Sequence, residues 1–200
     1  MSDPIDFWFD FSSPYSYIAS ELIDDLAAKY GRKVKWHPIM LGAAFKATGS
    51  QPLTMIPLKG EYSKRDFDRS ARFLGVPYHF PSKFPQVTLT AARAYYWLHP
   101  QDCAKAREFA RAVFRALWVD DRDVSDMAVI AGLANGLGID AAQLAAAVTA
   151  PEIKERLKEE TEAAIAKGLF GAPYFIVDGE PFWGADRLPQ IEKWLQSGGF

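Results

Sequence analysis

Apolar and aromatic residues at the start of the chain follow a spacing that predicts a strand, a helix and a second strand. The aromatic-rich run 5–11 predicts a buried strand. Apolar residues then recur four positions apart at Ile18, Leu22 and Leu26, which indicates one face of a helix. Segment 33–39 alternates polar with apolar residues and predicts another strand. This β-α-β order favours a parallel pair of strands with a right-handed crossover.

The middle of the chain, from about residue 60 to 167, has helical periodicity and hardly any strand signal. Ser125-Asp126 and Asp140 stand where side chains can accept hydrogen bonds from the free amides of a first helical turn. The clearest helical patterns cover residues 89–98, 104–119, 127–137 and 152–167.

The last part of the chain returns to strand patterns. Residues 174–177 predict a strand, Asp178-Gly179 is a strong signal for a hairpin turn, and residues 180–183 can return as the partner strand. Residues 188–195 predict a closing helix.

Together these patterns predict an α/β fold split by a helical insertion. Neither end of the chain has enough strands to make a sheet alone, which argues against two sequential domains. We expect one core from residues 1–59 and 168–200, and an all-helical insertion of residues 60–167. The chain has 200 residues, of which 49% are hydrophobic, so it can bury such a core.

Charge and cysteine content narrow the class of protein. A net charge of −2 gives no electrostatic argument for binding nucleic acid or an anionic membrane. The sequence has no secretory signal and no run of about 18 apolar residues that could span a bilayer. Its single cysteine, Cys103, excludes an internal disulfide. We therefore expect a protein of the reducing cytoplasm.

Two further residue types predict no chemistry. Cys103 lies in a helical pattern beside Ala104 and is interpreted as a small packing residue. His37, His79 and His99 are not at metal-ligand spacing, so no metal site is expected.

The first candidate for chemistry is Ser13-Pro14-Tyr15-Ser16, where the first strand meets a helix. Serine caps a first turn, and proline suits its first position. Free amides and the helix dipole favour an anion there, and a thiolate held there has a lowered pKa. Taken alone, the segment is interpreted as a plain helix cap.

Two more candidates lie near the C-terminus. Ala172-Pro173 enters the third strand, where a proline is usually trans. Trp183-Gly184-Ala185-Asp186-Arg187 lies between the hairpin and the last helix, where Asp186 could be a helix cap.

Together the three segments resemble the thioredoxin superfamily, in its branch with a helical insertion. Residues 13–16 take the place of the Cys-x-x-Cys segment of DsbA-type proteins, and Ala172-Pro173 the place of the cis-proline loop. The segment 183–187 resembles the loop that holds the γ-glutamyl end of glutathione in members that use it. Strand-Asp-Phe-x-Ser-Pro-Tyr-Ser-Tyr and the segment 41–49 are most similar to 2-hydroxychromene-2-carboxylate isomerases, and then to kappa-class glutathione transferases.

The resemblance implies a thioredoxin-like fold and a glutathione-dependent cis-trans isomerase of aromatic-compound degradation. Serines at both cysteine positions exclude a dithiol–disulfide cycle, so glutathione would supply the thiolate. Lys46 is implied to meet the carboxylate of an aromatic oxo-acid substrate, and the protein is implied to be a homodimer. The residues implied to hold glutathione are Ser13, which also stabilises its thiolate, with Ala172, Pro173, Trp183, Gly184, Ala185 and Asp186.

Two alternatives stay open. One is a kappa-like glutathione transferase or peroxidase, which consumes glutathione; the other is a non-catalytic peptide-binding module that retains only the cis-proline loop. Aromatic residues in or near the early insertion could line an apolar substrate pocket, with an arginine nearby to offset a carboxylate. The aromatic residues are Phe45, Tyr62, Tyr78, Phe80, Phe84 and Tyr95, and the arginines are Arg65, Arg69 and Arg72.

Overall fold

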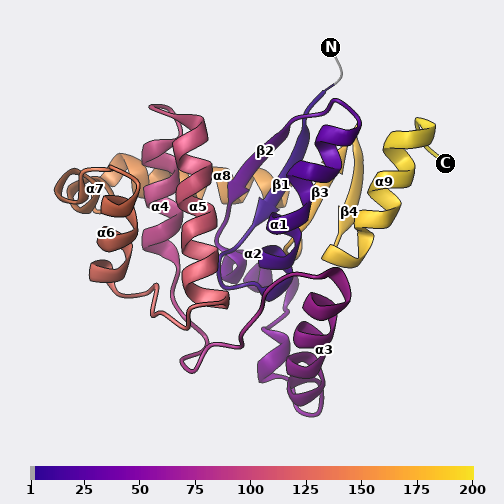
Figure 1. The fold of residues 1–200 in the computed structure, drawn as a ribbon, viewed down its shortest axis with the longest axis horizontal. Helices are drawn as coiled ribbons and strands as arrows, with labels where there is room; N and C mark the ends of the chain where they lie inside the picture. Colours follow the sequence, from indigo (N-terminus) through magenta and orange to yellow (C-terminus); the bar gives the residue numbers. More distant parts are fainter. Residues whose placement is uncertain (1–2) are drawn as a thin grey trace.

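The sheet at the centre of the molecule is built from the two ends of the chain. The computed structural model describes residues 3–200 and has one four-stranded sheet in the order β2-β1-β3-β4 (Figure 1). β1 (Ile5–Phe9) runs parallel to β2 (Val34–Pro38) and antiparallel to β3 (Tyr174–Val177). β3 pairs with β4 (Glu180–Trp183) as an antiparallel hairpin. The predicted parallel pair and the predicted hairpin are both confirmed.

The hairpin turn lies where the sequence places it. Asp178 and Gly179 have φ angles of 52° and 90°, which suit a tight turn between twisted strands. The Arg32 guanidinium holds the turn with a bidentate ion pair, in which Nη2 lies 2.7 Å from Asp178 Oδ1 and Nη1 lies 3.2 Å from Oδ2. Each edge strand contains a proline, Pro38 in β2 and Pro181 in β4.

β1 separates two hydrophobic cores, because its side chains alternate between the faces of the sheet. Phe7 and Phe9 belong to the larger core, where the Phe7 ring stacks on Phe175 with centroids 5.2 Å apart. Trp8 points to the other face and joins a smaller core with Tyr174.

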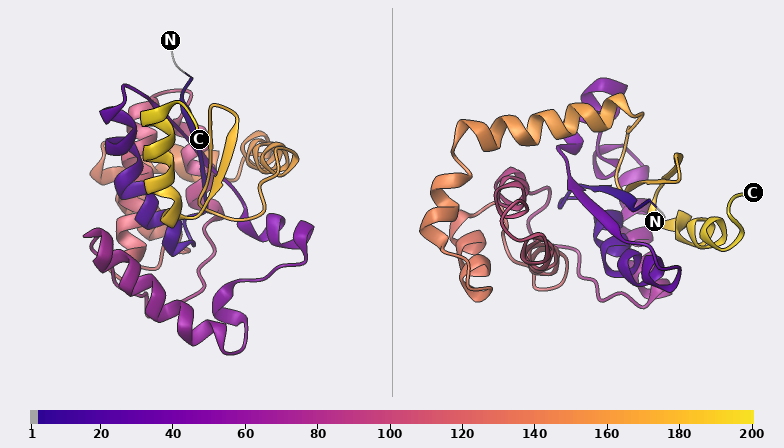
Figure 2. Two further views of the ribbon diagram at one scale, coloured as in Figure 1. Left: turned by 90° about the vertical axis from the view of Figure 1, so that its right-hand side faces the viewer. Right: turned by 90° about the horizontal axis from the view of Figure 1, so that it is seen from above.

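Helices cover both faces of this sheet (Figure 2, right). α1 (Pro14–Lys29) and α9 (Leu188–Ser197) lie on the face of the larger core. α8 (Pro151–Ala166) and α2 (Leu41–Thr48) lie on the other, where residues of both helices join the smaller core. α8 therefore packs directly on the sheet, although it lies within the predicted insertion of residues 60–167.

The remaining helices stand beside the sheet and extend the larger core. Four of the five specific helical predictions agree with the structure to within one residue at each end, and the closing helix runs two residues further than expected. Asp126 and Asp140 cap α6 and α7 as predicted. The division into core and insertion stays a prediction. These helices are α3 (Lys59–Leu74), α4 (Leu89–Leu98), α5 (Cys103–Trp118), α6 (Met127–Gly136) and α7 (Ala141–Ala147).

Three short elements were not predicted from the pattern of apolar residues: α2, the 3-10 helix η1 (Leu53–Met55) and the 3-10 helix η2 (Ala185–Arg187). Within residues 3–200 no helix is both long enough and apolar enough to cross a membrane.

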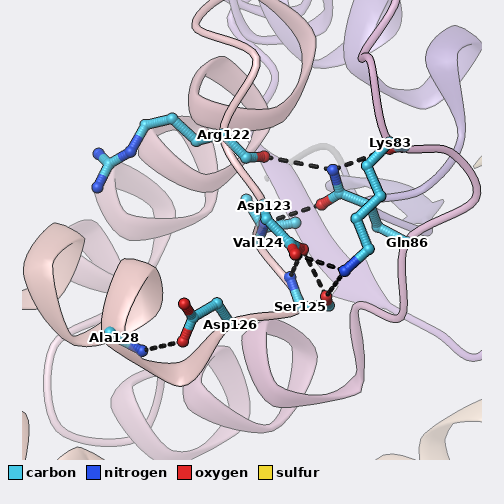
Figure 3. A network of polar contacts seen from close by, with 8 residues as sticks. All are labelled: Lys83, Gln86, Arg122, Asp123, Val124, Ser125, Asp126 and Ala128. Atoms are coloured by element: carbon cyan, nitrogen blue, oxygen red, sulfur yellow. Dashed lines mark hydrogen bonds and ion pairs between the residues drawn. The ribbon is translucent and has the colours of Figure 1, made fainter.

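The segment before α4 is fixed to the loop between α5 and α6 (Figure 3). The Gln86 amide donates to the carbonyl of Lys83 at 3.0 Å and accepts from the amide of Val124 at 2.8 Å. The Lys83 ammonium contacts the side chains of Asp123 and Ser125. These contacts tie two loops that are about 40 residues apart.

Candidate active site

The N-terminus of α1 lies at the end of the sheet where α2 and α3 gather (Figure 1). Ser13 is the N-cap, and its Oγ accepts from the amide of Ser16 at 3.2 Å. Pro14 occupies the first helical position, as the sequence predicts. The amide of Tyr15 has no acceptor within residues 3–200. The first turn therefore combines a filled cap with a free amide and the positive end of the helix dipole.

The cap is joined directly to the second predicted segment. Ala172-Pro173 is a cis peptide bond, and the Ser13 hydroxyl donates to the carbonyl of Ala172 at 3.1 Å. The carbonyl of Ala172 is therefore occupied by Ser13, while the amide has no acceptor among the described residues.

The third segment is held against the second by backbone and ring contacts. The amide of Gly184 donates to the carbonyl of Pro173 at 3.0 Å. Trp183 is 53% exposed, and its ring centroid lies 4.8 Å from that of Phe170. A Cβ on Gly171 would lie 2.5 Å from Trp183 Nε1, so only glycine lets the indole pack there.

Asp186 is exposed in the 3-10 helix η2 and pairs with Arg187 across 3.2 Å. The alternative interpretation of Asp186 as a helix cap is wrong, because Arg187 is the N-cap of α9 and no side chain caps that helix. Gly184 has a φ of 106°, and a Cβ there would lie 2.3 Å from Asp186 Oδ1. The glycine therefore permits the placement of the carboxylate next to it.

Tyr15 was named only as part of the first segment, and the structure gives it a role of its own. Its hydroxyl donates to Asp66 on α3, and its ring packs on Phe67 with centroids 5.1 Å apart. Burial, followed by the hydrogen bond to Asp66, raises the pKa of the Tyr15 phenol above its usual range. The negative charge of Asp186 contributes in the same direction. Tyr15 thus lies between carboxylates from α3 and η2.

Asp10 is a second residue that the sequence interpretation missed. Its buried carboxylate accepts from the amide of Ser12 at 2.8 Å, the hydroxyl of Thr88 at 3.0 Å and the amide of Leu41 at 2.9 Å. Asp10 thereby joins the turn before Ser13 to the start of α2 and to the residue before α4. An aspartate side chain often accepts from the backbone amide two residues further on, which forms a turn. The position of Asp10 two residues before Ser12 was therefore the available signal.

Lys46 lies in the last turn of α2, exposed and without an ion-pair partner within residues 3–200. The first residue of α2, Leu41, is tied to Asp10, and a helix rises about 1.5 Å per residue. The position of Lys46 is therefore fixed relative to the turn before Ser13. No hydrogen bond or ion pair among the described residues joins the side chain of Lys46 to that of Ser13.

The candidate pocket aromatics separate into two groups. Tyr95 does not line a pocket: it is 1% exposed in the core, and its hydroxyl donates to the carbonyl of Trp36 at 3.0 Å. Tyr78, Phe80 and Phe84 cluster with the buried Trp118 ring. Of the candidate arginines, Arg69 and Arg72 pair with acidic residues of their own helix, α3.

The interpretation of Cys103 as a packing residue is wrong. Cys103 is exposed at the first position of α5, although it lies at helical spacing from the buried Ala106 and Ala110. Its Sγ lies 3.4 Å from Nε2 of His99, one turn earlier in the chain. Among residues 3–200, no group of three or more histidine, cysteine or acidic side chains could hold a metal ion.

Comparison with known proteins defines the class. The profile of the DSBA-like thioredoxin domain matches residues 4–196, almost the whole chain. The chain is 33% identical over 198 residues to 2-hydroxychromene-2-carboxylate isomerase of Sphingobium xenophagum, covering 98% of this chain and 99% of the relative. It is 29% identical over 211 residues to human glutathione S-transferase kappa 1, covering 96% and 92%.

Solved structures agree. A structure of 2-hydroxychromene-2-carboxylate isomerase superposes with a TM-score of 0.87 at 29% identity, covering 96% of this chain and 94% of that one. The protein therefore belongs to the DsbA-like thioredoxin family, in the branch of 2-hydroxychromene-2-carboxylate isomerases and kappa-class glutathione transferases. The fold is thioredoxin-like, a mixed sheet of four strands with helices on both faces.

Proposed function

We propose that the protein is a glutathione-dependent cis-trans isomerase that acts on 2-hydroxychromene-2-carboxylate or a similar conjugated aromatic oxo-acid. One observation carries the proposal. Ser13 and Ser16 occupy a helix N-terminus beside the cis Ala172-Pro173 bond, in a chain whose similar proteins are named as such isomerases. Without a thiol at either position, the site needs one from outside.

The residues present fit a thiol-containing peptide. The amides of Tyr15 and Ala172 have no acceptor among the described residues, and the Asp186 carboxylate is exposed. The hydroxyl of the fully buried Ser16 also lacks a partner there. Free amides and one exposed carboxylate are the groups that a zwitterionic tripeptide with extended backbone can satisfy.

Each residue has a separate task in this proposal. The Ser13 hydroxyl donates a hydrogen bond to the sulfur, and together with the first turn of α1 it lowers the pKa of the thiol. The Ala172-Pro173 loop pairs with the peptide backbone. Asp186 binds the α-ammonium group, with Trp183, Gly184 and Ala185 forming the loop around it. Lys46 is the partner that the resemblance implies for the substrate carboxylate, which orients the substrate.

When bound, glutathione supplies a nucleophile that adds to a conjugated carbon and leaves again after the bond that has become single has rotated. The thiol is therefore regenerated in every cycle. Glutathione is plentiful in the cytoplasm, which is the setting we expected from the sequence. The homodimer that the resemblance implies stays a prediction.

The test is to measure free thiol during turnover of 2-hydroxychromene-2-carboxylate with glutathione far below substrate. We expect many turnovers and a constant thiol concentration. Loss of one thiol per product would instead favour a kappa-like transferase, the alternative supported by the similarity to human glutathione S-transferase kappa 1.

A further inference from the structure

A hollow of about 370 Å³ lies between η1, the start of α3 and the segment 80–85. Phe80 and Phe84, two of the candidate pocket aromatics, line it, whereas Lys46 and the residues assigned above to glutathione do not. Its volume lies within the roughly 300–1,000 Å³ of small-molecule sites. The side chains that matter here are those of Met55, Lys64, Phe80 and Phe84.

The lining combines aromatic walls with one positive charge. The Phe80 and Phe84 rings lie 5.2 Å apart, and Met55 is 61% exposed beside them. Lys64 Nζ stands 6.0 Å from the centre of the Phe80 ring. No acidic residue lines the hollow. These groups are complementary to a flat aromatic molecule that carries a negative charge.

Lys64 can give up its present partner at little cost. Its ammonium lies 2.8 Å from Glu61 Oε1, one turn earlier on α3, in a pair with both side chains largely exposed. Exposed pairs of this kind contribute little stability because water and salt screen them. A carboxylate in the hollow can therefore compete with Glu61 for the same ammonium.

Both walls of the hollow are joined to the turn that carries Ser13. On one side the Phe84 ring packs on Trp118, whose Nε1 donates to the carbonyl of Phe11 at 2.9 Å. On the other side, α3 contacts Tyr15 through Asp66 and Phe67. The segment 80–85 is also fixed from behind by the contacts of Lys83 and Gln86 (Figure 3). Both walls of the hollow are thus connected to residues that lie two positions before and after Ser13.

We propose that this hollow binds the ring of an aromatic carboxylate and that Lys64 pairs with its carboxylate. The assignment rests on the proposed function for the identity of the substrate. It adds Lys64 to Lys46, the lysine that the resemblance implies for the substrate carboxylate. Because Lys46 lies on α2 and does not line the hollow, substitutions can separate the two lysines.

The test is calorimetric titration of the full chain, without glutathione, with cinnamate and with uncharged cinnamyl alcohol. We expect saturable binding of cinnamate. Lys64→Met should weaken it by about tenfold while leaving the alcohol unchanged, since one charge-assisted contact is lost. Lys64→Arg should retain most of the affinity.

Lys158→Met is the matched control. Lys158 is also an exposed lysine, and it pairs with Glu155 one turn away on a helix of 16 residues. The substitution should leave cinnamate binding unchanged. No binding of cinnamate to the wild type, equal affinity in Lys64→Met, or a loss confined to Lys46→Met would each overturn the proposal. A separate titration with glutathione tests the proposed function, so the two can fail independently.

Discussion

The hydroxyl of Ser13 donates to the carbonyl of Ala172, 159 residues further along the chain. One side chain therefore closes the gap between the N-terminus of α1 and the cis Ala172-Pro173 loop while its oxygen also caps the helix. A serine hydroxyl has only one proton to donate. In the proposed site, the Ser13 hydroxyl exchanges its acceptor, from the carbonyl of Ala172 to the sulfur of glutathione.

Ser13→Ala should raise the pKa of the bound glutathione thiol by about one unit. A hydrogen bond to a charged group contributes roughly 1.5–3 kcal/mol, and one pKa unit corresponds to about 1.4 kcal/mol. The lower end applies because Ser13 gives up its bond to Ala172. The measurement is thiolate absorbance titrated against pH in the complex.

Loss of the cap itself should also destabilise the variant, by about 0.5–2 kcal/mol. Asp102→Ala is the control, because Asp102 caps α5 by accepting from the amide of Lys105 at 2.9 Å. It should lose similar stability and leave the thiol pKa unchanged. Identical titrations for Ser13→Ala and wild type would leave Ser13 as a cap alone.

Asp186→Asn should weaken glutathione binding about tenfold and change kcat at saturating glutathione very little. The substitution keeps the shape and removes the charge proposed to bind the α-ammonium. We expect the lower end of the usual range because the carboxylate is exposed, and the difference should shrink at high salt. Calorimetry at two salt concentrations measures this.

Glu180→Gln, which removes an exposed charge from β4 in the same hairpin, is the control and should bind glutathione normally. An unchanged affinity in Asp186→Asn would remove Asp186 from the proposed site. Its role could not then be reassigned to capping α9, because it does not cap that helix.

Tyr15→Phe should loosen α3 while leaving the other helices intact. The change removes the hydrogen bond to Asp66 but keeps the ring on Phe67, so about 1–2 kcal/mol should be lost at this contact alone. Hydrogen exchange should accelerate at the amides of α3.

Tyr17→Phe is the comparison, because the Tyr17 hydroxyl donates to the carbonyl of Pro77 outside α3. Its α3 amides should exchange as in the wild type. Unchanged exchange of α3 in Tyr15→Phe would mean that the packing of Phe67 suffices to hold the helix.

Asp178→Asn should lower the melting temperature by roughly 1–3 °C at neutral pH, a small effect because the ion pair with Arg32 is partly exposed. Asparagine accepts the positive φ of this position, so the turn is preserved. The hydrogen bond with Arg32 lowers the pKa of the Asp178 carboxyl.

A lowered pKa means that the pair stabilises the fold above the unfolded value of about 3.9, and that this stability is lost as pH falls below it. The difference between variant and wild type should therefore shrink as pH falls through the lowered pKa of Asp178 and vanish in stronger acid. If the difference in stability persists in acid, its cause is the turn and not the charge of Asp178. Asp25→Asn, at an exposed position of α1, is the control and should leave the melting temperature at neutral pH unchanged.

Much of the fold follows from local patterns. The helices with repeated apolar positions, and the hairpin with its Asp-Gly turn, are found because one short stretch of sequence contains the whole signal. α2 was missed as a helix because it is short and buries only Ala44 completely, which leaves little periodicity to detect. Cys103 was misjudged because helical spacing places it on the buried face of α5, whereas at the first position of the helix that face is exposed.

The site is less visible from sequence, because its contacts are non-local. Sequence identified the segments of Ser13, Ala172 and Asp186, each on a different part of the chain. It could not show that Ser13 already occupies the Ala172 carbonyl, or that Tyr15 reaches Asp66 across 51 residues. Asp10 was overlooked because an aspartate after a strand gives the same signal whether it serves one turn or joins three elements.

The prolines of the two outer strands limit how this molecule can associate with others. A proline has no N–H to offer, so Pro38 and Pro181 interrupt the row of donors along each open edge of the sheet. Exposed sheet edges can polymerise by adding a strand from another molecule. The two prolines make such strand addition unfavourable at both β2 and β4. If two copies of the chain assemble, we expect their interface to be formed by side chains of their helices. The sheet of each copy should keep its four strands and not pair with the sheet of the other.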